Sequence, residues 1–242
     1  MNTRHATNFV VSLMTVFTLH LGLNQATNGA ESDVRGGKLF LQTKVYSAEE
    51  DEMILRQLAG LRVAEVSDGM DQFGLPDIGL VAPAIRPLWR DADEYRHRFV
   101  GIAVTVRYVP AQLPHARERE PEAFDRWVGD WYTRISPEPF VELIRPGSAL
   151  VIEEAPLTDV GSIGSNNILG WKLRGCVGVV TSGTARDTDE ITAQKVPLYF
   201  QGPGRGIRPG RNQVESVNRP VVVGGVTVMP GDVIVADGDG VI

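Results

Sequence analysis

The fold of this chain is decided by the stretch Thr181-Ser182-Gly183-Thr184-Ala185-Arg186-Asp187-Thr188-Asp189-Glu190. The stretch joins the apolar run before it to a polar segment with helical character. It therefore predicts a strand, a tight turn and the start of a helix. An arginine and an aspartate stand side by side in the turn. Strands that lead into helices through short turns are the units of α/β domains.

A second turn, rich in glycine, lies upstream at Gly161-Ser162-Ile163-Gly164-Ser165-Asn166-Asn167, and a helical pattern over 166–174 follows it. Gly164 is predicted to adopt a backbone conformation that other residues avoid. The free N–H groups at the start of a helix carry a partial positive charge, so Gly164, Ser165, Asn166 and Asn167 form a candidate anion site. The alternative is that the three polar residues only cap the helix.

The Arg186-Asp187 pair also has two interpretations. Arg186 could hold a substrate carboxylate through two parallel N–H bonds, and Asp187 is a hard oxygen ligand suited to Mg²⁺ or Mn²⁺. Alternatively, Asp187 caps the helix predicted over 188–194 while Arg186 pairs with a surface acid. Glu190, one helical turn further, is either a capping partner or a carboxylate that orients the metal ligands without binding the metal itself. Spacing alone leaves both interpretations open.

The rest of the chain alternates between strand and helix patterns, which favours an α/β fold over a sandwich or a helical bundle. Ser47 and Glu50 form a capping box at the start of the first helix. The expected helices cover 47–60, 63–73, 122–135, 166–174 and 188–194. The expected strands cover 99–109, 148–153, 177–182 and 197–201, and the end of the chain, 220–242, is predicted to be rich in strands.

Composition and charge narrow the function classes. The chain has 242 residues, and its hydrophobic and charged fractions of 43% and 22% are those of an ordinary globular protein. Its formal net charge of −6 argues against a nucleic-acid-binding protein. Cys176 is the only cysteine, so an intrachain disulfide is excluded and a buried structural thiol is expected. His97 and His115 are predicted to lie on the surface.

The first thirty residues have the layout of a secretory signal peptide. A basic start is followed by an apolar run over 9–23 and by small polar residues that end at Ala30. The expected organisation is a signal peptide over 1–30, a linker over 31–46 and a single domain over 47–242, in an exported protein without a membrane span. The alternative is a misassigned start or a disordered tail on a cytoplasmic protein.

The spacing of glycines around the two turns resembles one known family. Gly164 precedes a helix that ends in Arg174-Gly175, a Gly178-Val179-Val180 strand follows, and Gly183 leads through Arg186-Asp187 to Glu190. This pattern is similar to that of the 4-hydroxy-4-methyl-2-oxoglutarate aldolases and the regulator of ribonuclease activity A. The resemblance extends from about Leu55 to the end of the chain, except for the region 110–134.

The resemblance implies a single α/β/β layered domain of the swivelling type with mixed sheets, assembled as a trimer or hexamer. It also implies a lyase that cleaves a C–C bond of a 2-oxo acid and releases pyruvate, with Mg²⁺ or Mn²⁺ as cofactor. Asp187 would hold the metal, while Arg186 and the Gly164–Asn167 amides would bind the substrate. Decarboxylation of oxaloacetate would need the same arrangement.

One departure from the family pattern is Ser165, which stands where the active aldolases carry an acid. Because this acid is missing, the resemblance also leaves open a second function, that of a non-catalytic regulator that binds a ribonuclease or another protein.

Overall fold

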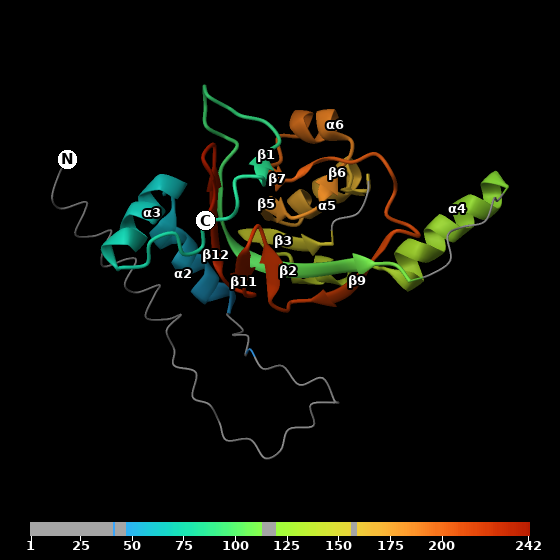
Figure 1. Ribbon diagram of the computed structural model, residues 1–242, viewed down its shortest axis with the longest axis horizontal. Helices are drawn as coiled ribbons and strands as arrows, with labels where there is room; N and C mark the ends of the chain where they lie inside the picture. Colours follow the sequence, from blue (N-terminus) through green and yellow to red (C-terminus); the bar gives the residue numbers. More distant parts are fainter. Residues whose placement is uncertain (1–40, 42–46, 113–119, 156–158) are drawn as a thin grey trace, which may run out of the picture.

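The computed structural model describes residue 41 and residues 47–112, 120–155 and 159–242. The expected signal peptide, His115 and the expected linker (apart from residue 41) lie outside these ranges. Within them, no helix has the length and apolar character needed to cross a membrane. The architecture is a layered mixed α/β fold, which confirms the predicted class (Figure 1).

A large mixed sheet forms the centre of the molecule. Its four central strands run parallel in the order β7-β5-β3-β2, and antiparallel strands complete both edges. The parallel strands are β2 (Phe99–Pro110), β3 (Ser148–Glu154), β5 (Cys176–Thr181) and β7 (Leu198–Phe200). The antiparallel strands are β1 (Arg86–Pro87), β9 (Asn212–Val217), β12 (Val233–Asp237) and β13 (Gly240–Val241).

The two faces of this sheet carry separate hydrophobic clusters because successive side chains of a strand point to opposite faces. On β3, Leu150 and Ile152 pack towards the helices α5 (Ser165–Leu173) and α6 (Thr188–Ala193). Ala149 and Val151 pack instead towards the hairpin of β10 (Val221–Val223) and β11 (Val226–Val228). The sheet is therefore covered by helices on one face and by a hairpin on the other.

A small parallel sheet was not predicted from the sequence. It consists of β4 (Gly161–Ile163), β6 (Thr184–Ala185) and β8 (Gly202–Pro203), in that order. Its first strand lies in the glycine-rich turn and its middle strand lies in the Arg-Asp turn. The small sheet therefore holds the two turns beside each other at the start of α5.

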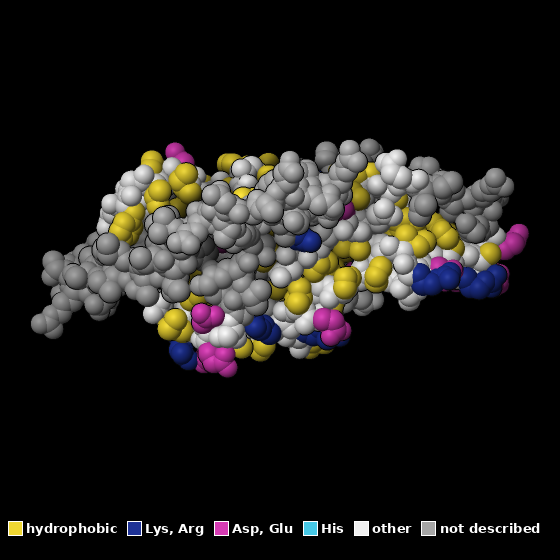
Figure 2. Space-filling view, turned by 90° about the horizontal axis from the view of Figure 1, so that it is seen from below, with side chains coloured by type: hydrophobic (Ala, Val, Ile, Leu, Met, Phe, Trp, Pro, Cys, Tyr) yellow, Lys and Arg dark blue, Asp and Glu magenta, His cyan; other side chains and the backbone are white. Residues whose placement is uncertain are grey.

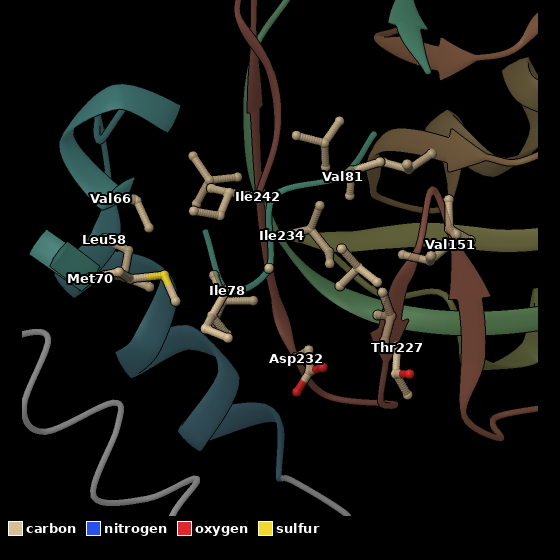
Figure 3. Close-up of a pocket in the computed structure, with 18 residues that line it drawn as sticks. Leu58, Val66, Met70, Ile78, Val81, Val151, Thr227, Asp232, Ile234 and Ile242 are labelled. Carbon is tan, nitrogen blue, oxygen red and sulfur yellow. The ribbon is translucent and has the colours of Figure 1, made fainter. Parts of the chain in front are cut away.

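Two helices, α2 (Ala48–Leu58) and α3 (Val63–Gln72), lie at one end of the molecule (Figure 1). The predicted capping box at the start of α2 is confirmed, because Ser47 and Glu50 exchange hydrogen bonds. Between α2, α3, β12 and the hairpin lies a pocket of about 320 Å³, which we call the apolar pocket (Figure 3). Most of its lining side chains are aliphatic.

A third helical region, α4 (Pro121–Asp130), projects from the opposite end and buries none of its side chains fully (Figure 1). The predicted helix over 122–135 continues beyond α4 as a π-helical turn, Trp131–Ile135, and a 3₁₀ helix follows at Pro139–Leu143. On the face seen in Figure 2, acidic and basic side chains adjoin one another in mixed groups.

His97 is not a surface residue, so that prediction was wrong. His97 is 4% exposed, and its ring packs against Trp89 and Tyr199. The backbone N–H of Leu198 donates to its Nε2 at 3.3 Å. Burial lowers the pKa of His97 to about 4, so the ring is neutral near pH 7. The expectation for Cys176 is confirmed, since it is a free and buried thiol.

Candidate functional site

Gly164 is the N-cap residue of α5, and its backbone is extended, with φ −116° and ψ 169°. The prediction of an unusual conformation was therefore wrong. What the position requires is space, because a Cβ atom there would stand 2.9 Å from Asp187 Oδ2. Arg186 Nε and Asn167 Oδ1 would each lie 3.7 Å from the same point. Three polar side chains thus converge on the volume that the missing side chain leaves open.

Asp187 occupies the N-cap position of α6, but its side chain makes no capping hydrogen bond. Its backbone is left-handed, with φ 57° and ψ 36°, a conformation that aspartate tolerates better than most residues. This conformation accompanies a carboxylate that faces α5, where Oδ2 accepts the backbone N–H of Ser165 at 3.3 Å. The carboxylate is therefore held at the start of the neighbouring helix instead of capping its own.

Arg186 is fixed through its backbone, since its N–H donates to the carbonyl of Ile163 at 2.8 Å. Its side chain is 40% exposed, and its Nε lies 3.6 Å from Asp187 Oδ2. Among the described residues, Asp187 is its ion-pair partner. Within the described ranges, no ion pair involves the other guanidinium nitrogens, which can therefore bind an anion.

These groups line a pocket of about 410 Å³, which we call the motif pocket. The pocket brings together most of the predicted site residues and adds two that were not predicted. Its lining consists of Tyr132, Glu138, Gly164, Asn166, Asn167, Arg186 and Asp187. Ser165 and Glu190 are not part of this lining. They contact each other instead, because Ser165 Oγ donates to Glu190 Oε2 at 2.5 Å.

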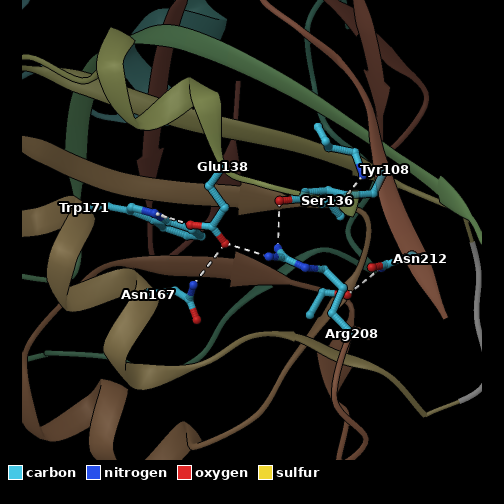
Figure 4. A network of polar contacts seen from close by, with 9 residues as sticks. Tyr108, Ser136, Glu138, Asn167, Trp171, Arg208 and Asn212 are labelled. Carbon is cyan, nitrogen blue, oxygen red and sulfur yellow. Dashed lines mark hydrogen bonds and ion pairs between the residues drawn. The ribbon is translucent and has the colours of Figure 1, made fainter. Parts of the chain in front are cut away.

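Glu138 is a pocket residue that sequence reasoning missed. Its Oε1 accepts hydrogen bonds from Asn167 Nδ2 at 3.0 Å and from Arg208 at 2.8 Å (Figure 4). Its Oε2 accepts from the indole N–H of Trp171 at 3.4 Å. Glu138 therefore connects the motif pocket to α5 and to a loop seventy residues away in sequence. No local pattern in the sequence points to such a contact.

Arg208 contacts Glu138 from outside this lining and was also missed by sequence reasoning; only 3% of it is exposed. Its guanidinium donates to the hydroxyl of Tyr108 at 2.7 Å and pairs with Glu138. The guanidinium carbon lies 4.9 Å from the centre of the Tyr108 ring and 5.1 Å from that of Tyr132. A buried cation that is paired and stacked in this way fixes one wall of the pocket.

A buried carboxyl group, Glu154, lies in the same region at the end of β3 and is 6% exposed. Asn212 Nδ2 donates to its Oε2 at 3.2 Å and to Ser162 Oγ at 2.8 Å. Burial raises the pKa of Glu154 to about 7, although the Ser162 hydroxyl and the charge of Arg208 act in the opposite direction. Glu154 therefore changes its protonation near neutral pH.

The donor set around Asp187 fits a hard cation that keeps much of its water. Mg²⁺ commonly binds proteins through one or two carboxylates and retains several waters. The Asp187 side chain is 37% exposed and uses Oδ2 for its contact with Ser165. No cluster of three or more His, Cys, Asp or Glu suited to a metal exists within the described ranges. A closed, all-protein metal cage is thus not observed in that part of the chain.

The sequence matches the profile of a family described as RraA-like (Aldolase/RraA) over residues 63–242. This match includes the main sheet and the whole of the motif pocket. The chain belongs to the RraA-like family. The resemblance proposed from the spacing of the two turns is therefore confirmed.

Relatives of this RraA-like chain carry different names. Protein DlpA of Legionella pneumophila is 28% identical over 80% of this chain, and the match covers 28% of that protein. A protein of Halalkalibacterium halodurans, provisionally named 4-hydroxy-4-methyl-2-oxoglutarate aldolase, is 33% identical over 40% of this chain and 45% of its own length. The chain therefore spans less than half of the length of these two relatives.

A solved structure shows the same fold. Streptomyces coelicolor RraAS2, described as an unusual member of the RNase ES inhibitor RraA protein family, superposes with a TM-score of 0.62. The superposition covers 79% of this chain and 85% of RraAS2 at 21% sequence identity. At this identity the likeness supports the fold of the RraA-like chain and carries no conclusion about its activity.

Proposed function

We propose that this RraA-like protein is a divalent-metal-dependent lyase that cleaves a C–C bond of a small 2-oxo acid and releases pyruvate. The observation that carries the proposal is the convergence of Arg186, Asp187 and Asn167 on the open volume above Gly164. A cation, an anion and the N–H groups at a helix start are the groups that a chelating oxo acid and its metal need.

Each group has a separate part in the proposed reaction. Arg186 binds the substrate carboxylate, and the start of α5 supplies N–H groups with a partial positive charge. Asp187 would hold Mg²⁺ or Mn²⁺ through its carboxylate, whose Oδ2 also accepts the Ser165 N–H. When bound, the metal supplies a Lewis acid that withdraws electron density from the oxo acid.

With 4-hydroxy-4-methyl-2-oxoglutarate as substrate, the bond between C3 and C4 breaks and its electron pair remains on C3. The 4-hydroxyl group loses its proton, and C4 becomes a carbonyl carbon. A proton then adds to C3, so that two molecules of pyruvate result. With oxaloacetate, carbon dioxide leaves in place of the second pyruvate. Both reactions place developing negative charge beside Arg186 and the helix start, where it is stabilised.

The test is a pyruvate-release assay with both substrates in the presence of Mg²⁺ or Mn²⁺. Asp187→Asn keeps the size of the side chain and tolerates the left-handed backbone, so it removes mainly the charge. We expect it to lower turnover at least about 100-fold. Asp189→Asn, an exposed position in the same segment, is the matched control. Absence of metal-dependent turnover in the wild type would overturn the proposal.

The second candidate function is a non-catalytic regulator that binds a ribonuclease or another protein. The observation that favours it is Ser165, whose hydroxyl contacts Glu190 and brings no carboxylate to the pocket. This function predicts a stable protein complex that survives Arg186→Met. Pull-down with the purified wild type and this variant, followed by the pyruvate assay on the same samples, separates the two functions.

We further propose that the protein forms a homotrimer or hexamer, as the family resemblance implies. Sedimentation velocity of the purified protein measures the mass directly, and a monomer would contradict this proposal.

A further inference from the structure

We infer that the side-chain carbonyl oxygen of Asn167 is a second oxygen ligand for the divalent cation, beside Asp187, and that Glu138 holds this oxygen in position. The inference rests on the proposed function, because it concerns the cation that the motif pocket would bind. It assigns a metal-binding role to an amide on α5 and a positioning role to a carboxylate outside the glycine-rich motif.

The first observation is that both oxygens face one small volume. Asp187 Oδ2 and Asn167 Oδ1 lie 2.9 Å and 3.7 Å from the point where a Cβ atom of residue 164 would stand. Because residue 164 is glycine, no side chain fills this point. Carboxylate and amide carbonyl oxygens are the protein ligands that hard cations prefer.

The second observation fixes which end of the Asn167 amide faces the cation. Glu138 Oε1 accepts from Asn167 Nδ2 at 3.0 Å. An ionised carboxylate can only accept hydrogen bonds, so it selects the amide nitrogen and turns the oxygen the other way. Arg208 donates to the same Oε1 at 2.8 Å. The orientation of the amide is thus a consequence of its hydrogen bond to Glu138.

Glu138 itself is not free to bind the cation. Its Oε1 already accepts two donors and its Oε2 accepts the indole N–H of Trp171. Its side chain is only 18% exposed, and its partner Arg208 is buried. Metal ligands are commonly oriented by a neighbouring carboxylate that does not touch the metal. Glu138 fits this description for Asn167.

The experiment measures Mn²⁺ binding without any turnover. Electron paramagnetic resonance of free Mn²⁺ gives the dissociation constant of the full-length protein with and without pyruvate. We expect Asn167→Leu to weaken Mn²⁺ binding about tenfold, because it removes the oxygen at almost unchanged volume.

The positioning role of Glu138 is tested with Glu138→Asp. This variant keeps the charge beside Arg208 but withdraws the acceptor from Asn167 by one methylene. We expect Mn²⁺ binding to weaken about three- to tenfold. Glu142→Asp, an exposed glutamate in the 3₁₀ helix that begins directly after Glu138, is the matched control and should bind as the wild type does. Circular dichroism establishes that each variant is folded.

The outcomes separate this inference from the proposed function. An unchanged dissociation constant for Asn167→Leu, together with loss of binding in Asp187→Asn, would overturn the inference and leave the proposed function standing. No Mn²⁺ binding by the wild type, with or without pyruvate, would overturn both.

Discussion

The motif pocket and the apolar pocket are similar in size, about 410 Å³ and 320 Å³, but they differ in the charged side chains that line them. The motif pocket contains Arg186, Asp187 and Glu138. The apolar pocket has one acidic side chain in its lining, Asp232, whose carboxylate accepts the backbone N–H of Met229 at 2.8 Å. The comparison teaches that volume alone does not locate function, whereas converging polar groups do.

The two pockets also differ in how they are supported. The wall of the motif pocket depends on buried charges, chiefly Arg208 and Glu138. The apolar pocket depends on aliphatic side chains from α2, α3, β12 and the hairpin, which Figure 3 shows facing one another. Substitutions of Arg208 or Glu138 should therefore change both stability and metal binding. Those in the second should change stability alone.

The largest expected effect comes from breaking the charged wall with Arg208→Met. The variant leaves Glu138 without its buried partner, and we expect it to lower the free energy of unfolding by about 3–5 kcal/mol. Urea denaturation measures this loss. Arg205→Met is the matched control, because its ion pair with Asp159 is similarly short but its side chain is 87% exposed. Similar losses in both variants would show that burial is not the cause.

The next effect concerns Glu154 and depends on pH. The unfolded chain releases this proton near pH 4.5, whereas the folded protein holds it until about pH 7. Stability therefore falls as the pH rises through this window, because the unfolded state gains the ionised form first. Glu154→Gln removes the loss, so at pH 8 the variant should be more stable than the wild type by up to about 3 kcal/mol.

The measurement for Glu154 is urea denaturation of both proteins at pH 4 and pH 8. Near pH 4 the two proteins should differ little, because the carboxyl group is then neutral in the folded and unfolded states. Parallel stability profiles across the whole range would mean that Glu154 titrates normally in the folded protein.

A smaller effect is expected in the apolar pocket from Ile234→Ala. Ile234 is 5% exposed, but one side of it faces the existing pocket, so the variant creates less new cavity than a fully enclosed site would. We expect a loss of about 2 kcal/mol, at the lower end of such substitutions. Pyruvate release per folded molecule should not change. A matching loss of activity would show that the two pockets are coupled.

The smallest expected change in free energy comes from Gly164→Ala. This variant tests whether the glycine is needed for the space beside Asp187 or for its backbone conformation. The extended backbone accepts alanine, but the new Cβ would displace Asp187 Oδ2. We expect Gly164→Ala to weaken Mn²⁺ binding about tenfold with little change in stability. Gly170→Ala, in the middle of α5 with open space around it, should stabilise the helix by about 0.5–1 kcal/mol and leave Mn²⁺ binding unchanged. Equal Mn²⁺ binding by the two variants would show that the site does not need the space that Gly164 leaves beside Asp187.

Much of the fold could be predicted because local patterns determine it. The strands β2, β3 and β5 and the helices α2, α5 and α6 follow periodicity and capping signals, and their bounds agree within a few residues. The two turns of the motif pocket could be identified because their glycines and charged residues are close together in sequence. Their meeting at α5 follows from the small parallel sheet, whose strands are too short to show a period.

The rest could not be predicted because it depends on contacts between distant segments. Glu138 and Arg208 meet across seventy residues, and neither lies in a recognisable pattern. His97 is buried because Trp89 and Tyr199 happen to surround it in three dimensions. Gly164 was predicted as a site residue and does line the motif pocket, but the predicted reason was wrong. The glycine supplies room for other side chains and has an ordinary extended backbone.

The pairing of β2 has a consequence for the kinetics of amide exchange. This strand pairs with β3 on one edge, and on the other it pairs with β12 in its first half and β9 in its second. Its amides are therefore shielded on both edges while the sheet is intact. We expect Val104 and Val106 to exchange their amide hydrogens only through global unfolding. Amides of α4, which buries no side chain fully, should exchange through local opening long before them.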